Sequence, residues 1–149
     1  LLFVGNADCI AEIIFGGVCH RFPKLRFISV ESGVGWLPGF LEAADWQWAN
    51  MEVRKEHPEY DLRPSEYFRR QIYGCFWFER DHVTDALVSY PDNMMFETDY
   101  PHPTCQHPGP ATPAVGPVRY VDEALSGLPD DVKRKVLGST AARLYRVTI

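Results

Sequence analysis

This sequence lacks the patterns on which several functional classes depend. Its 149 residues contain no Cys-x-x-Cys pair, no His-x-His pair and no glycine-rich phosphate-binding motif after a predicted strand. The four cysteines are too widely spaced for a paired metal or redox motif and too few for a disulfide-dense fold, so we expect reduced thiols. The missing phosphate-binding motif argues against a small nucleotide-binding protein.

Charge and hydropathy argue against two further kinds of partner. The formal net charge is −5, from 15 Lys and Arg against 20 Asp and Glu, and the basic residues form no continuous stripe. No apolar run is long enough to span a membrane, and residues 1–5 lack the basic region of a signal peptide. We therefore expect a cytoplasmic protein with no nucleic-acid or membrane partner. The start at Leu1, inside an apolar run, indicates an N-terminally incomplete domain.

Strand-forming and helix-forming patterns alternate along the chain. Short runs rich in branched and aromatic residues predict three strands, at residues 25–30, 72–78 and 94–98. Apolar residues at helical spacing predict helices around them, with N-caps at Asn6 and Asp81 and with Pro38 in the first turn of the longest helix. The alternation predicts βα units, a parallel sheet and one α/β domain over residues 1–149.

The last third of the chain combines a long loop with short helices. Residues 100–117 contain six prolines and predict a loop that serves as a lid, a site wall or a spacer. Beyond it, the patterns predict helices at 120–125 and 129–137, followed by a last helix capped by Ser139.

Carboxylates stand where the predicted strands end. Glu31, Glu79 and Asp99 each follow a strand, and His102 lies shortly after Asp99. The carboxyl ends of parallel strands form the edge at which α/β proteins bind ligands, so Asp99 and His102 are candidates for catalysis. The structural alternatives are that Asp99 caps the following turn and that His102 is a surface residue between two prolines.

Three blocks of sequence stand out together, at residues 21–38, 63–70 and 96–102. In this order they resemble the amidohydrolase-related family, which includes aminocarboxymuconate-semialdehyde decarboxylase and other metal-dependent decarboxylases and hydrolases. The tail, at residues 128–145, is similar to the closing helices of that family. The resemblance implies an α/β fold that is the C-terminal portion of a TIM (β/α)8 barrel, with about three parallel strands and flanking helices.

The resemblance also implies a metal site. In this family a divalent metal, commonly zinc, is held by a His-x-His pair, a further His and an Asp at the end of the last strand, and Asp99 matches that Asp. A carboxylate suits this position because it binds hard cations and can also accept a proton. The chain has no counterpart of the other ligands, so we expect the metal to be weakly held or absent in this fragment.

The resemblance assigns roles to neighbouring side chains as well. Glu31 stands where the decarboxylase carries a catalytic His, and it is expected to act as a second acid or base. The alternative is that Glu31 accepts N–H bonds in the Gly33–Gly35 turn. His102 is expected to lie in a loop near the substrate, and Trp36 is expected to form an apolar wall of the site or else to belong to the core.

Arg69 and Arg70 are the candidate substrate-binding cations. Their guanidinium groups are suited to a substrate carboxylate. The alternative is that they form ion pairs with Glu66 or Glu79 on neighbouring elements.

These features predict a metal-dependent hydrolase or carboxy-lyase that acts on a small carboxylated or cyclic substrate. The alternative function is a catalytically inactive remnant or an interaction scaffold. Three strands cannot close a barrel, which needs about 250 residues, so open sheet edges are expected and favour pairing into a homo-oligomer.

Overall fold

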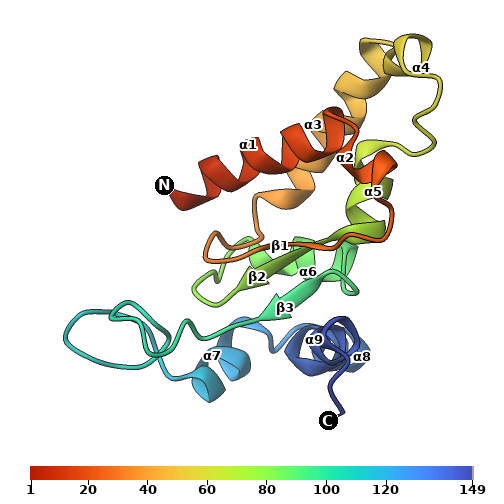
Figure 1. The fold of residues 1–149 in the computed structure, drawn as a ribbon. Helices are drawn as coiled ribbons and strands as arrows, with labels where there is room; N and C mark the ends of the chain where they lie inside the picture. Colours follow the sequence, from red (N-terminus) through yellow and green to blue (C-terminus); the bar gives the residue numbers. More distant parts are fainter. Residues whose placement is uncertain (149) are drawn as a thin grey trace.

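The computed structural model describes residues 1–148, which form helices packed around a small sheet (Figure 1). The helices that precede and separate the strands are α1 (Leu2–Phe15), α2 (Val18–Arg21), α3 (Leu37–Asn50), α4 (Val53–Glu56), α5 (Pro64–Gln71) and α6 (Val83–Ser89). The strands are β1 (Phe27–Ser29), β2 (Ile72–Phe76) and β3 (Met94–Phe96). The sheet is followed by α7 (Pro117–Ala124), α8 (Asp130–Arg134), the π-helical turn η1 (Lys135–Ser139) and α9 (Thr140–Tyr145).

The sheet is parallel, and β2 lies between β1 and β3. Phe27 pairs with Ile72 in one ladder, and Gly74 pairs with Met94 in the other. Parallel neighbours require crossover connections, which are provided here by α3 to α5 and by α6. The expected alternation of strands and helices is confirmed, and the carboxyl ends of the three strands therefore lie at one edge of the sheet.

The main hydrophobic core joins the strands to the helices around them. It contains Ile14 of α1, Leu41 of α3 and Leu87 of α6, together with Phe76 of β2 and Met94 of β3. These side chains are at most 1% exposed. The apolar residues of α3 lie on one broad face of the helix, and this face packs against the core, as their spacing in the sequence predicted.

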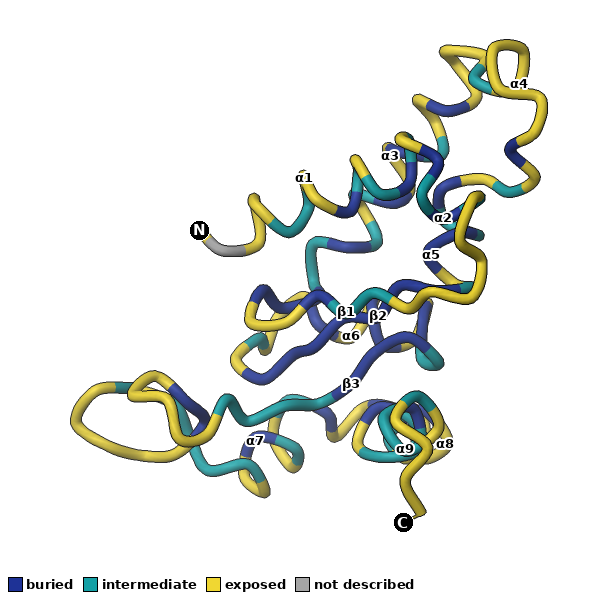
Figure 2. Tube along the Cα trace, viewed as in Figure 1, coloured by how far each residue is buried: buried dark blue, intermediate teal, exposed yellow. Residues whose placement is uncertain are grey.

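A second, smaller hydrophobic cluster contains strand residues that are not part of the main core. Tyr73, Cys75 and Met95 form it, and Ala141 and Leu144 of α9 pack against it. All five residues of β2 are buried, which Figure 2 shows as a dark blue strand. Burial of consecutive strand residues is typical of parallel sheets that are covered on both faces.

Two of the expected helix caps, Asn6 and Asp81, are wrong, and the third, Ser139, occupies the N-cap position of α9 without a side-chain hydrogen bond. Asn6 lies inside α1, which begins at Leu2, and its side-chain amide donates hydrogen bonds to Ser29 Oγ at 2.9 Å and Val30 O at 3.1 Å. His82, and not Asp81, precedes α6, and Ser139 makes no capping hydrogen bond at the start of α9. Asn6 is instead used in a tertiary contact that ties α1 to the end of β1.

The proline-rich segment between β3 and α7 is a long loop, as expected. It extends away from the sheet beyond the end of β3, and Pro117 begins the next helix (Figure 1). Among residues 1–148, no helix is both long enough and apolar enough to cross a membrane.

Candidate functional site

The edge formed by the carboxyl ends of the strands gathers four acidic residues. Glu31 follows β1, Glu79 follows β2, and Glu97 and Asp99 follow β3. Glu31 has a φ of 59° and Asp99 a φ of 57°, so both adopt the left-handed backbone conformation that side chains other than glycine rarely take. Such residues cluster at functional sites. Two of the residues that the sequence singled out therefore stand at sharp turns of the backbone at this edge.

Asp99 and His102 contact each other. Asp99 Oδ2 lies 3.0 Å from His102 Nδ1, and the backbone N–H of His102 donates to the carbonyl of Asp99 at 2.9 Å. The Asp99 side chain is 12% exposed, whereas that of His102 is 56% exposed. His102 Nδ1 also lies 2.8 Å from Thr104 Oγ1. The histidine thus orients a largely enclosed carboxylate from the solvent side.

Glu97 is a site residue that the sequence analysis did not single out. Its carboxylate accepts a hydrogen bond from the backbone N–H of Glu31 at 3.1 Å and another from the Cys75 thiol, so it connects the ends of all three strands. Burial raises the pKa of Glu97; the two hydrogen bonds oppose this rise, and the charges of Asp99 and Glu31 add to it. The sequence offered one signal for Glu97, which lies two residues before Asp99. Side chains two residues apart along an extended strand point to the same face.

Glu79 takes the role that was considered for Glu31. Its carboxylate accepts hydrogen bonds from the backbone N–H of Val34 at 2.9 Å and of Gly35 at 2.6 Å. Gly33 has a φ of 67°, and a Cβ there would lie 2.6 Å from Glu79 Cδ. Glu79 therefore holds the turn after β1, and Glu31 keeps an exposed side chain at the site edge.

The pKa of Glu79 leads to a prediction about stability. Burial raises this pKa, although the N–H groups of Gly35 and Val34 oppose the rise. The contribution of Glu79 to the free energy of unfolding is thus full below its unfolded pKa of about 4.3 and is lost as pH rises through the higher folded pKa. The free energy of unfolding should therefore decrease with rising pH in the unaltered protein, and we expect Glu79→Gln to lack this decrease. Urea denaturation of both proteins between about pH 4 and pH 8 measures it, and parallel pH profiles would contradict the assignment.

Trp36 lines a cavity at this edge of the sheet. Its Nε1 donates to the carbonyl of Gly33 at 3.0 Å, and its ring contacts that of Phe40 at a centroid distance of 5.5 Å. The cavity has a volume of about 560 Å³ and also includes Phe3, Phe78 and Glu79. Trp36 is only partly buried and packs against the main core, and neither Asp99 nor Glu31 lines this cavity. Its role as a wall of the site therefore stays a prediction.

Arg69 and Arg70 are not brought together with Asp99. They belong to α5, which leads directly into the start of β2 and therefore lies at the opposite end of the strands. Arg69 Nη1 donates to the carbonyl of Ser89 at 2.8 Å, and its guanidinium lies over the ring of Tyr90 at 4.2 Å.

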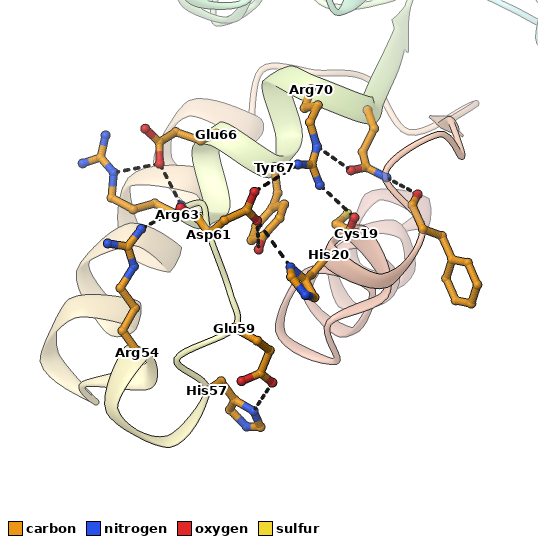
Figure 3. Close-up of polar contacts among 12 residues, drawn as sticks. Cys19, His20, Arg54, His57, Glu59, Asp61, Arg63, Glu66, Tyr67 and Arg70 are labelled. Carbon is orange, nitrogen blue, oxygen red and sulfur yellow. Dashed lines mark hydrogen bonds and ion pairs between the residues drawn. The ribbon is translucent and has the colours of Figure 1, made fainter.

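Arg70 belongs to a separate polar cluster (Figure 3). Its Nη2 donates to the carbonyl of Cys19 at 2.8 Å, and its Nη1 lies 3.6 Å from Asp61 Oδ2. Neither Glu66 nor Glu79 is its ionic partner in the described part of the chain. Both arginines thus hold α5 against its neighbours, and the substrate-binding role expected from sequence gains no support from their positions.

The donor set does not amount to a metal site. Asp99 offers a hard oxygen ligand in an enclosed position, but a zinc ion requires at least three protein ligands. Within residues 1–148, no group of three or more His, Cys, Asp or Glu side chains is arranged to hold a metal ion. The described residues therefore provide one suitable ligand and do not hold a metal by themselves.

A parallel sheet with crossover helices and an acidic edge at the carboxyl ends of its strands is the arrangement at which α/β proteins, barrels among them, build their sites. The sequence model of the amidohydrolase family matches residues 8–147, and the chain belongs to this family. A search of curated proteins found no match.

Two solved structures are similar to this chain over 93% of its length, each with a TM-score of 0.66. An amidohydrolase of Mycobacterium avium subsp. paratuberculosis K-10 is 26% identical, and the 5-carboxyvanillate decarboxylase LigW of Sphingomonas paucimobilis is 28% identical. The chain spans 32% and 38%, respectively, of these two proteins. The expected family and fold are confirmed: three parallel strands with helices that match part of an amidohydrolase TIM barrel.

Proposed function

We propose that this chain supplies the last strands, and part of the active site, of a metal-dependent hydrolase or carboxy-lyase. The substrate class is a small carboxylated or cyclic compound. The observation that carries the proposal is Asp99, a largely enclosed carboxylate at the end of β3, held in a left-handed backbone conformation and paired with His102. Its position agrees with that of the last metal ligand which the family resemblance implies.

Each residue of the site has a distinct role in this proposal. Asp99 would contribute one ligand to a divalent metal, zinc as the family resemblance implies, and would accept a proton from the attacking water in hydrolysis. The metal, when bound, supplies charge stabilisation in the transition state. Glu31 acts as a second acid or base, His102 orients the carboxylate of Asp99, and Trp36 forms an apolar wall for the substrate.

Two observations favour different bonds as the site of cleavage. The similarity to a 5-carboxyvanillate decarboxylase supports release of CO2 from a carboxylated ring. The carboxylate of Glu31 at the end of β1, where the resemblance implies a histidine in decarboxylases, supports hydrolysis instead. The proposal includes both decarboxylation and hydrolysis. Assays for CO2 release and for hydrolysis products distinguish the two reactions.

The test uses a complete barrel protein that contains this sequence. We expect it to bind a divalent metal in about equimolar amount, and to release CO2 or a hydrolysis product from a panel of aromatic and cyclic carboxylates. Removal of the metal by a chelator should abolish turnover, and its return should restore it. A folded protein that binds no metal and turns over no substrate would instead favour the interaction scaffold.

His102 is expected to tune this activity without being essential. Because its Nδ1 lies 3.0 Å from Asp99 Oδ2, His102→Ala removes a group that orients a metal ligand. Loss of such an outer partner lowers metal affinity or activity by about 10- to 100-fold. Metal titration and steady-state kinetics measure this, with His107→Ala in the same loop as the control. Equal behaviour of the two variants would contradict the role given to His102.

A further inference from the structure

The peptide bond between Val30 and Glu31 is held at both of its polar groups. The side-chain amide of Asn6, in α1, donates a hydrogen bond to the carbonyl of Val30 at 3.1 Å. On the other side, the backbone N–H of Glu31 donates to Glu97 Oε1 at 3.1 Å. Asn6 also donates to Ser29 Oγ at 2.9 Å, so it is bound to the last residue of β1 as well. One peptide plane after β1 is therefore fixed by a helix and by the residue that follows β3.

This double hold accounts for the backbone conformation of Glu31. Its φ of 59° lies in the left-handed region, where a residue with a side chain remains only if the surrounding structure enforces it. Because a peptide group is planar, hydrogen bonds to its C=O and N–H fix the plane from which this rotation starts. The next turn is fixed as well, since Glu79 accepts the N–H bonds of Val34 and Gly35. Glu31 thus lies between two segments that are both held by side chains from other elements.

Glu97 reaches Glu31 from a fixed position. Its backbone N–H donates to the carbonyl of Phe76 at 3.0 Å, and its carboxylate accepts a hydrogen bond from the thiol of Cys75. Both partners belong to β2, the central strand, so the sheet sets the distance that the Glu97 side chain has to span. The carboxylate of an aspartate lies one C–C bond, about 1.5 Å, closer to the backbone, which puts it beyond hydrogen-bonding distance of the Glu31 N–H. The contact therefore depends on the length of the side chain.

The Glu31 side chain depends on this backbone for its direction. It is exposed, and within residues 1–148 no hydrogen bond or ion pair holds its carboxylate. We propose that Asn6 and Glu97 are positioning residues. By fixing the Val30–Glu31 peptide, they set the direction in which the Glu31 carboxylate leaves the end of β1. This inference rests on the acid–base role of Glu31 in the proposed function.

Two substitutions of Glu97 separate its reach from its charge. Glu97→Gln keeps the length and an acceptor oxygen but loses the charge, whereas Glu97→Asp keeps the charge but loses the reach. In the complete barrel protein, we expect Glu97→Gln to keep kcat within about 3-fold and Glu97→Asp to lower it by about 10- to 100-fold, because misplacement of a reacting group by about 1 Å has effects of this size. KM should change by less than about 3-fold in both variants. The reverse order of the two variants would overturn the proposal.

A double-mutant comparison shows whether Glu97 acts through Glu31. When Glu31→Gln has already removed the acid–base group, Glu97→Asp should cause no further loss of kcat, because the effects of the two residues are coupled. An equal loss in both backgrounds would contradict the positioning role. Glu42→Asp, the same chemical change at an exposed position of α3, is the control and should leave kcat unaltered.

Hydrogen exchange in the 149-residue chain, followed by NMR, tests the geometry without turnover. The amide of Glu31 should be protected in the unaltered chain and in Glu97→Gln, and it should exchange at least about 10-fold faster in Glu97→Asp. Equal exchange rates in the three proteins would show that Glu97 does not hold the peptide. If the complete protein turns over no substrate, the proposed function fails, and the exchange rates still decide whether the peptide is held.

Asn6→Leu keeps the test decisive if the Glu97 variants do not fold. It removes the amide donor with a side chain of similar size, so kcat should fall and the loss should again vanish in the Glu31→Gln background. Asn50→Leu, at an exposed asparagine that ends α3, is the matched control. Unaltered kcat in Asn6→Leu would overturn the proposal.

Discussion

Asp99→Asn, made in a complete barrel that contains this chain, is expected to lower kcat/KM by about 10²- to 10⁴-fold. The substitution keeps the size of the side chain and its contact with His102, but it removes the negative charge that binds a cation and accepts a proton. Metal affinity should fall together with activity. Steady-state kinetics and measurement of the bound metal after dialysis test both parts of this expectation.

The matched control is Asp122→Asn. Asp122 is an exposed acid on α7, so the same chemical change there should leave activity and metal content unaltered. Circular dichroism of both variants checks that the fold is intact. Retention of full activity by Asp99→Asn would show that Asp99 is a structural residue at the end of β3, and the catalytic role would have to be abandoned.

Phe76→Ala is expected to have the largest effect on stability, about 3–5 kcal/mol in the free energy of unfolding. Phe76 ends the central strand β2 and is fully buried, and its ring contacts that of Phe96 at a centroid distance of 5.7 Å. Truncation opens a cavity between β2 and β3 that the surrounding core cannot refill. Urea denaturation followed by circular dichroism measures the loss.

Phe78→Ala provides the control for this prediction, since Phe78 is two residues further along and 56% exposed. It should change the free energy of unfolding by less than about 0.5 kcal/mol. If Phe76→Ala does not fold, Phe76→Leu should still fold, with a loss of about 1.5 kcal/mol. Equal stability of the Phe76 and Phe78 variants would mean that the core is not centred on β2.

Local patterns predicted the elements well. The branched and aromatic run at 72–78 became β2 over Ile72–Phe76, and the apolar spacing after Pro38 became α3 over Leu37–Asn50. The strand at 25–30 is shorter than expected, with β1 at Phe27–Ser29. Strand ends depend on pairing with a neighbour, and pairing is not encoded in the run itself.

The site was predicted only in part. Asp99 and His102 could be paired from sequence because they are close along the chain and follow a strand. Glu97 was missed although it lies in the same block, because its partners Glu31 and Cys75 belong to other strands. Arg69 and Arg70 looked like substrate ligands, yet they are used to anchor α5.

The sequence by itself determined the family, the order of the βα elements and the place of Asp99 at the end of a strand, because each of these follows from residues that are close along the chain. Only the tertiary structure decided which carboxylate holds the turn after β1, since Glu79 and Val34 are 45 residues apart. It likewise decided that Arg70 bonds to Cys19, which is 51 residues away. Such partners are selected by how strands and helices pack, and buried polar groups must find them wherever packing brings them.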